Sequence, residues 1–273
     1  MARVACVQMR SGPDAQTNVD RLDALVARAA SEGAVFVATP ENTTLLTTPS
    51  EKVAAAEPLD GPTHRALAEL AKRHGVWLLV GSVAERCETN RSRCHNTSVL
   101  YDADGALVAS YRKRHLFDIA LPDGPSFQES AHIEPGHQIV VADTPIGRLG
   151  LSVCYDLRFP EHYAALVAAG AEVLAVPSAF TVPTGAAHWH TLLRARAIET
   201  QCFVLAPAQE GPHGGGRTSY GHSLVVDPWG VVLAECAEGE GVVFAEVNRE
   251  RVHQLREAMP VAAHRTRAKI DRS

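Results

Sequence analysis

The sequence predicts a single layered α/β domain with mixed β-sheets, and three observations support this fold class. Segments with helical spacing of apolar residues alternate with short, buried strands along most of the chain. The middle of the chain adds strands that are joined by a hairpin signal. No low-complexity linker divides the 273 residues. Helices that cover mixed sheets account for all three features.

Two strand–helix units are predicted in the first part of the chain. Their elements are strand Arg3–Met9, helix Thr17–Ala30, strand Ala34–Ala38, helix Thr63–His74 and strand Val76–Ser82. The first helix is indicated by apolar residues such as Leu22, Leu25 and Val26, which share one helical face. Gly33 and Gly75 follow the two helices in the position of C-terminal caps.

The middle of the chain has a different character. Thr97–Tyr101 and Ala106–Tyr111 are predicted strands, and residues 102–105 between them carry a hairpin signal. Arg112–Gly136 is polar and contains several prolines and glycines, so it is predicted to be a long loop. A loop of this length in a compact domain is usually functional.

The second half again alternates between strands and helices. The predicted strands are Arg148–Val153, Ala171–Val176, Cys202–Ala206, Ser219–Val226, Val231–Glu235 and Val242–Val247. The predicted helices are Pro160–Ala169, Ala186–Gln201 and a segment from about Arg249 to Ala258. We expect one domain over residues 1–260 and a basic, solvated tail over residues 261–273. The basic residues of this tail are Arg265, Arg267, Lys269 and Arg272.

Composition and charge exclude several classes of function. The formal net charge is −5, so a polyanion such as nucleic acid is not an expected partner. No segment approaches the ~18 apolar residues of a membrane span, and Met1–Met9 has the pattern of a strand and not of a signal peptide. The six cysteines form no CxxC pattern, which favours free thiols and a cytoplasmic location.

Cys154 differs from the other cysteines in its setting. A predicted strand ends at Val153, and a helix is predicted to begin within the next few residues, so Cys154 lies on a strand-to-helix turn. A thiol on such a turn is exposed at the sheet edge, with backbone N–H groups nearby that can hold an oxyanion. The alternative is a buried cysteine that acts only as a small apolar residue.

Glu41 and Lys113 also follow predicted strands. Taken singly, Glu41 has the setting of a capping or surface carboxylate, and Lys113 that of a solvated basic turn. Together with Cys154 they place a carboxylate, an ammonium and a thiol at three strand ends, which could meet at one sheet edge. Attack on a carbonyl group needs this set, because it requires a base, a cation for the oxyanion and a nucleophile.

The residues around these three positions resemble the motifs of the nitrilase superfamily, in that family's order and spacing. The matching segments are residues 40–42, 111–117, 153–161, 177–180, 185–189, 193–201, 220–223 and 226–230. The resemblance implies a four-layer α-β-β-α sandwich, hydrolysis of a carbon–nitrogen bond, and neither a metal nor an organic cofactor. It further implies Glu129 as an auxiliary carboxylate, with Glu134 as its competitor, and the Tyr155 backbone N–H as an oxyanion donor.

The thirteen histidines give no independent sign of a metal site. His188 and His190 are two residues apart, so they do not share a helix face. Cys94 and His95 are adjacent, which does not suit an ordinary zinc chelate. We therefore expect no metal.

Residues 155–158 are similar to the branch that holds omega-amidases and deaminated-glutathione amidases, which act on amides of 2-oxoglutaric acid. Residues 115–119 and 127–130 resemble the omega-amidases. Residues 195–202, 217–223 and 225–230 resemble the deaminated-glutathione enzymes more closely, and we favour that activity. An omega-amidase stays the alternative, and a non-catalytic scaffold on the same fold stays a further one, because fold alone does not establish activity.

Three residues are candidates for substrate binding. Arg158, four residues beyond Cys154, could hold a substrate carboxylate, although an ion pair with Asp156 or Glu161 explains it equally well. Phe180 and His188 lie in segments that match the family. The partner is then a small amide that bears a carboxylate.

We also expect a homodimer or a multiple of one. The predicted helices Pro160–Ala169 and Ala186–Gln201 have apolar faces that could exceed what one sheet covers. These faces contain Tyr163, Leu166, Val167, Trp189, Leu192 and Leu193. In the superfamily this region forms the subunit interface.

Overall fold

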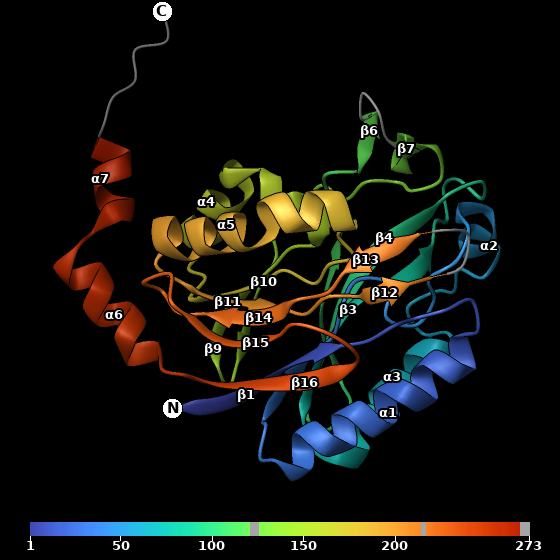
Figure 1. Cartoon of the computed structure of the whole chain (residues 1–273), viewed down its shortest axis with the longest axis horizontal. Helices are drawn as coiled ribbons and strands as arrows, with labels where there is room; N and C mark the ends of the chain where they lie inside the picture. Colours follow the sequence, from blue (N-terminus) through green and yellow to red (C-terminus); the bar gives the residue numbers. More distant parts are fainter. Residues whose placement is uncertain (121–125, 214–216, 268–273) are drawn as a thin grey trace, which may run out of the picture.

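The structure, a computed structural model, describes residues 1–120, 126–213 and 217–267. Its centre consists of two six-stranded β-sheets (Figure 1). The first sheet has the order β16 (Gly241–Val247), β1 (Ala2–Gln8), β2 (Phe36–Ala38), β3 (Trp77–Arg86), β4 (Cys94–Tyr101) and β5 (Leu107–Arg112). The second has the order β15 (Val232–Cys236), β14 (Ser223–Val226), β11 (Phe203–Ala206), β10 (Val173–Ala175), β9 (Gly147–Leu151) and β8 (Val141–Thr144). Three strands in each sheet are parallel and the others antiparallel, so the prediction of mixed sheets is confirmed.

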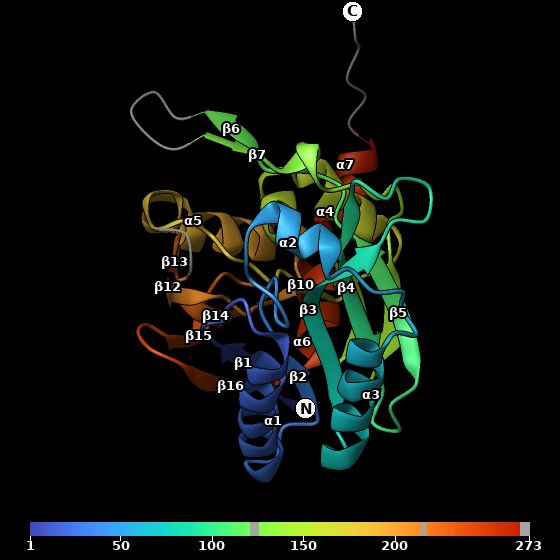
Figure 2. The ribbon, with the colours of Figure 1, turned by 90° about the vertical axis from the view of Figure 1, so that its right-hand side faces the viewer.

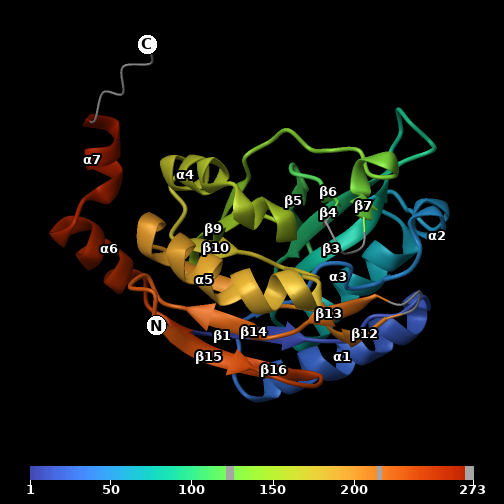
Figure 3. The ribbon, with the colours of Figure 1, turned by 45° about the horizontal axis from the view of Figure 1, so that its top comes forward.

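Helices cover the outer faces of both sheets. α1 (Ala15–Ser31) and α3 (Pro62–His74) lie against the first sheet, and α4 (Pro160–Ala168) and α5 (Val182–Thr200) lie against the second (Figure 2). This is the four-layer α-β-β-α arrangement that the sequence resemblance implies. A short helix, α2 (Pro49–Ala54), contacts β3. Figure 3 shows α6 (Arg249–Ala258) and α7 (Val261–Arg267) at the opposite end of the molecule from α2.

Alternation along β1 builds two separate cores. Val4 and Cys6 point to the space between the sheets and belong to a cluster that continues through the second sheet to α4 and α5. Ala5 and Val7 point the other way and pack with residues of α1 and α3. Because successive strand side chains face opposite sides, one apolar strand can serve both cores.

Local caps lie at the start of α1 and at the end of α3. The Asp14 side chain accepts a hydrogen bond from the Thr17 N–H at 2.7 Å and caps the start of α1. Gly75 ends α3 with a φ of +62°, a left-handed conformation that glycine adopts without steric cost.

The segment Arg112–Gly136, which was predicted to be a long loop, contains short regular elements. The segment contains the hairpin β6 (Asp118–Ala120) and β7 (Ser126–Gln128) and the short 3-10 helix η1 (Glu129–Ala131). Strands of three residues carry too little periodicity to be recognised in a sequence. Residues 121–125, which also fall in this prediction, lie outside the described residues.

Other elements also differ from the predicted ones. Ser219–Val226 was predicted as one strand but is divided into β13 (Thr218–Tyr220) and β14. The break falls at Gly221 and His222, which both have positive φ. β13 pairs instead with β12 (Glu210–Pro212). α2, β8, β12 and α7 were not predicted, since each is short.

The predicted solvated tail begins with a helix, because α7 spans Val261–Arg267. Residues 262–265 are exposed, so this helix is largely in contact with solvent. Lys269 and Arg272, which were predicted to continue the basic tail, lie outside the described residues. Within residues 1–120, 126–213 and 217–267, no helix combines the length and the apolar character that a membrane span requires.

A buried carboxylate, that of Asp156, ties the two sheets together at one end. It accepts hydrogen bonds from the Tyr111 hydroxyl at 2.7 Å, from the His115 backbone N–H at 3.0 Å and from the Val153 N–H at 2.9 Å. Tyr111 belongs to β5 of the first sheet, whereas Val153 follows β9 of the second. Burial raises the pKa of Asp156, but the hydrogen bonds from His115, Tyr111 and Val153 lower it by more than burial raises it. The net shift of the pKa is therefore downward.

We expect Asp156→Ala to lower the free energy of unfolding by roughly 3 kcal/mol or more, because several buried donors lose their acceptor. The depressed pKa means that the Asp156 contribution is present above the ordinary carboxyl pKa and is lost as the pH falls. Urea unfolding followed by circular dichroism measures both effects. Asp143→Ala, at a carboxylate whose side chain is 91% exposed, is the control and should change stability little. Equal stabilities of the two variants would contradict the structural role of Asp156.

Candidate active site

Glu41 lies at the end of β2, as the sequence predicts, but it is buried. Its Oε1 accepts a hydrogen bond from Asn96 Nδ2 at 2.9 Å and one from Lys113 Nζ at 3.0 Å. Gly81 of β3 allows this geometry, because a Cβ there would lie only 2.1 Å from the Thr39 carbonyl oxygen. The glycine therefore lets β3 pass close to the segment that delivers Glu41.

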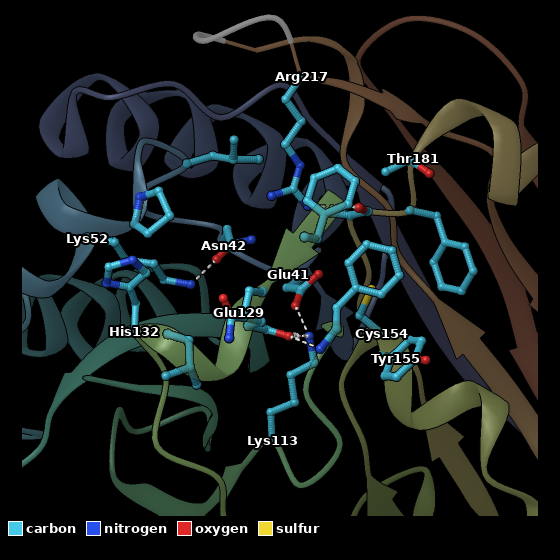
Figure 4. Close-up of a pocket in the computed structure, with 18 of the residues that line it drawn as sticks. Glu41, Asn42, Lys52, Lys113, Glu129, His132, Cys154, Tyr155, Thr181 and Arg217 are labelled. Atoms are coloured by element: carbon cyan, nitrogen blue, oxygen red, sulfur yellow. Dashed lines mark hydrogen bonds and ion pairs between the residues drawn. The ribbon is translucent and has the colours of Figure 1, made fainter. Parts of the chain in front are cut away.

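Lys113 follows β5, and its ammonium group is buried between two carboxylates (Figure 4). In addition to Glu41, it contacts Glu129 Oε1 at 3.0 Å and Glu129 Oε2 at 2.9 Å. Its backbone N–H donates to the Asn96 carbonyl group, which fixes the base of the side chain. Burial lowers the pKa of Lys113, but the charges of Glu129 and Glu41 raise it more, so the amine stays protonated.

Cys154 stands at the turn between β9 and the 3-10 helix η2 (Cys154–Arg158). Its φ of +49° is left-handed, which is uncommon for a residue other than glycine and typical of strained functional positions. The predicted exposure was wrong, because Cys154 is only 9% exposed. The thiol nevertheless lines a pocket together with Glu41 and Lys113.

The electrostatic environment keeps the Cys154 thiol protonated. Burial raises its pKa well above the ordinary value, and the charge of Glu41 raises it further, while Lys113 opposes both. Glu41 is shifted the other way. Burial raises its pKa, but the charges of Lys113, Lys52 and Arg217 outweigh burial and bring it to about 2. The resting pair is therefore a thiol next to a carboxylate.

Glu129 starts η1 and uses both carboxylate oxygens. Besides Lys113, Oε1 accepts from Asn96 Nδ2 at 3.3 Å and Oε2 accepts from the Phe117 N–H at 2.7 Å. The competing residue, Glu134, forms an ion pair with Arg93 at 2.9 Å and does not line the pocket. Among the described residues the structure thus brings Glu129, not Glu134, to Lys113.

The pocket around these groups is lined by apolar, aromatic and charged side chains. They come from residues 41–52, from the segment around β6, β7 and η1, from residues 154–158, from residues 179–184 and from Arg217. Phe117, Phe127 and Tyr155 form one aromatic wall, with ring centroids 5.1–5.2 Å apart between neighbours. A small organic molecule can therefore reach Cys154 between charged groups and an aromatic surface.

Two of the three predicted substrate-binding residues line the pocket, and the third does not. Arg158 and Phe180 line the pocket, and the Arg158 guanidinium lies 5.4 Å from the centre of the Phe180 ring. Within the part of the chain that is described, Arg158 makes no ion pair with Asp156 or Glu161, so that alternative is not supported. His188 is exposed, contacts Arg158 Nη1 at 3.3 Å and does not line the pocket.

Sequence reasoning missed three polar residues of this site. Asn96 lies inside β4 and bridges Glu41 and Glu129. Lys52 belongs to α2, a helix that was not predicted. Arg217 opens one of the segments that resemble the family, which was the one available signal for it.

Comparison with known proteins identifies the family of this chain. The Carbon-nitrogen hydrolase family model matches residues 3–257. The chain is 45% identical to the deaminated glutathione amidase of Homo sapiens over 96% of this chain and 81% of that protein. It superposes on the crystal structure of the C. elegans NitFhit protein with a TM-score of 0.90 and 41% identity, over 97% of this chain and 66% of that chain. A mutant of the amidase from Nesterenkonia sp. AN1, with acrylamide added to its active-site cysteine, has a TM-score of 0.79 and 30% identity over 98% of this chain and 100% of that chain.

The chain belongs to the carbon–nitrogen hydrolase family. It is thus a member of the nitrilase superfamily and an enzyme that hydrolyses carbon–nitrogen bonds other than peptide bonds. The sequence motifs that predicted this family surround the pocket that contains Cys154.

One group of side chains in this carbon–nitrogen hydrolase has ligand atoms close enough to hold a metal ion, within the residues that the structure describes. His190, His222 and Glu235 have ligand atoms within 4.8 Å of one another. None of the three lines the pocket. Glu235 Oε1 accepts hydrogen bonds from His190 at 3.0 Å and from His222 at 2.6 Å, which accounts for the cluster without an ion.

Lys113→Met should destabilise the hydrolase in a pH-dependent manner. In the wild type the pKa of Glu41 is about 2, so its stabilising contribution is present above its ordinary pKa of about 4.3 and is lost as the pH falls towards 2. Without the ammonium, two neighbouring buried carboxylates repel each other, and protonation relieves this at low pH. The stability difference from the wild type should therefore be largest near neutral pH and shrink towards about pH 4.

Denaturant unfolding at several pH values measures this difference. Lys72→Met removes an exposed lysine of α3 and is the matched control, with an expected effect close to zero at every pH. A loss of stability that does not vary with pH would mean that Lys113 acts through packing and not through its charge.

Proposed function

We propose that this chain is a thiol amidohydrolase that cleaves deaminated glutathione to 2-oxoglutarate and Cys-Gly through a thioester on Cys154. The observation that supports this most is the convergence of Cys154, Glu41 and Lys113 in one pocket. The deaminated glutathione amidase of Homo sapiens, at 45% identity, supports the choice of substrate. The amide is a small molecule that bears carboxylates, and no metal takes part in the proposed steps.

The acylation step follows from the proton positions in the resting site. Because the Cys154 thiol is protonated and Glu41 is ionised, the proton moves to Glu41 as the sulfur attacks the amide carbonyl carbon. Lys113 and the Tyr155 N–H stabilise the oxyanion. Glu41 then gives the proton to the departing nitrogen as the C–N bond breaks. A water activated by Glu41 hydrolyses the thioester and regenerates the thiol.

Glu129 fits a positioning role better than a proton-transfer role. Both of its oxygens accept hydrogen bonds, from Lys113, Asn96 and the Phe117 backbone. A carboxylate engaged in this way holds the ammonium in place and is poorly placed to exchange a proton with substrate. Phe117 also belongs to the aromatic wall, so Glu129 connects Lys113 to the pocket surface.

Two other functions are less well supported. An omega-amidase would need the same four side chains, but its leaving group would be ammonia in place of Cys-Gly. A non-catalytic scaffold would not need Cys154, Glu41, Lys113 and Glu129 to be brought together, and it is disfavoured because the chain is similar to enzymes.

The wild-type protein should release Cys-Gly from deaminated glutathione, and Cys154→Ala should abolish this release. Rapid acid quenching of the wild type during turnover, followed by mass spectrometry, should find the acyl group on Cys154, whereas Glu41→Gln should not be acylated, because it lacks the base that takes the thiol proton. Liquid chromatography of the products provides the rate measurement. Acylation of Cys6, Cys94 or Cys202, which are buried free thiols, would contradict the assignment.

We also infer a homodimer. Of the six apolar residues on which the predicted interface depended, Tyr163, Leu166, Trp189 and Leu193 are buried within the chain, whereas Val167 and Leu192 are half-buried. A candidate interface, here called the Trp229 patch, consists of four apolar side chains that are 43–56% exposed: Ile198, which belongs to one of the predicted interface helices, and Trp229, Val231 and Leu233. Apolar side chains gathered in this way are typical of an interface. The six free cysteines fit a reducing compartment such as the cytoplasm.

Sedimentation at micromolar protein should show a species of at least twice the chain mass of 29.3 kDa. Trp229→Glu should shift it towards the monomer, because a charge would be buried in the interface. Val108→Glu, at an exposed valine of β5, is the control and should leave the assembly intact. A wild-type monomer would refute the dimer, and an unaffected Trp229→Glu assembly would place its interface elsewhere.

A further inference from the structure

The pocket contains more positive charge than its carboxylates neutralise. Lys113 is paired with Glu41 and Glu129, and these three groups together carry one negative charge. Lys52, Arg158 and Arg217 also line the pocket. Within the described residues, none of these three cations has a carboxylate at ion-pair distance. A pocket with this excess of positive charge is complementary to a substrate with more than one negative charge.

Lys52 is held in the pocket by the residue that follows Glu41. Its Nζ donates to Asn42 Oδ1, which Figure 4 shows as a dashed line. Asn42 has a left-handed φ of +59°, and its backbone N–H donates to Ser82 Oγ at 2.8 Å. A strained residue that is fixed by β3 therefore directs the ammonium of α2 towards the site.

Arg217 reaches the pocket from the start of β13. Its Nη2 donates to the Ala179 carbonyl oxygen at 3.1 Å, and Ala179 is a backbone hydrogen-bond partner of the Cys154 thiol. Arg217 Nε is buried and has no hydrogen-bond partner among the residues that are described. A buried guanidinium N–H without an acceptor is costly, so the side chain is arranged for a bound acceptor.

The position of Glu41 decides which end of the substrate these cations meet. In the proposed mechanism Glu41 protonates the leaving nitrogen, so the leaving group must lie on the side of Glu41. Figure 4 shows Glu41 between Cys154 and the pair Asn42–Lys52, with Arg217 above it. Both Lys52 and Arg217 act on the charge of Glu41. Arg158, which packs on Tyr155 and Phe180, belongs to the side of the nucleophile.

We propose that Lys52 and Arg217 bind a carboxylate on the leaving group of the amide. They thereby select substrates whose departing amine bears a carboxylate. This inference rests on the proposed amidohydrolase function and deepens it. The Cys-Gly portion of deaminated glutathione ends in such a carboxylate, whereas the ammonia released from 2-oxoglutaramate carries none. Arg158 is then left for the carboxylate of the 2-oxo acid.

The test compares two substrates that differ only at the leaving-group carboxylate: deaminated glutathione and its C-terminal carboxamide. The wild type should prefer the acid in kcat/KM by roughly 10- to 100-fold, the range for a hydrogen bond to a charged group. Lys52→Met and Arg217→Met should each reduce this preference, chiefly through KM, and the double variant should remove it. Both cations also lower the pKa of Glu41, so the readout is the ratio of the two kcat/KM values, in which an effect on the shared chemistry cancels.

Three results would separate the possible failures. If the wild type hydrolyses neither substrate, the proposed function is wrong. If the wild type hydrolyses both equally, or if the variants keep the full preference for the acid, the function stands and the carboxylate site is refuted. If Lys52→Met and Arg217→Met lower kcat/KM for both substrates by the same factor, the two cations support the reacting groups and do not bind the leaving group. Arg65→Met, on the exposed face of α3, is the control and should keep wild-type kinetics.

Discussion

The buried ammonium of Lys113 is the constraint on which the rest of this site depends. A charge that is 2% exposed must be compensated within hydrogen-bond distance, and Glu41 and Glu129 provide this at 2.9–3.0 Å. The compensation requires the ends of β2 and β5 and the start of η1 to lie at one place. Gly81 and Asn96 then become necessary, since one allows close packing of the backbone and the other satisfies both carboxylates.

The proposed nucleophile, Cys154, comes from the other sheet, so the relative position of the two sheets must also be fixed. Asp156 does this, because its carboxylate bonds Tyr111 and His115 on either side of Lys113 and also bonds Val153, which precedes Cys154. One buried side chain therefore links the backbone of the cation to the backbone of the thiol. Sliding of one sheet over the other would break these bonds before it separated Cys154 from Lys113.

Sequence reasoning predicted the parts of this arrangement that depend on the local sequence around each residue. Glu41, Lys113 and Cys154 each follow an apolar run, and strand ends meet at a sheet edge, so their meeting could be predicted. Lys52 and Asn96 could not, because their roles depend on contacts with Asn42 and Glu41, which are 10 and 55 residues away. The burial of Cys154 also depends on distant segments, among them the one that contains Pro177, which accepts its backbone N–H.

The opposite pKa shifts of Cys154 and Glu41 have a consequence for how the site is protected and activated. A thiol with a raised pKa is a poor nucleophile at rest and reacts slowly with oxidants and adventitious electrophiles. In the proposed mechanism, an amide carbonyl placed near Lys113 changes this balance, because the developing oxyanion takes over part of the positive charge that lowers the pKa of Glu41. The carboxylate then becomes a stronger base at the moment when the thiol must lose its proton. Substrate binding and proton transfer are in this way coupled through one shared cation.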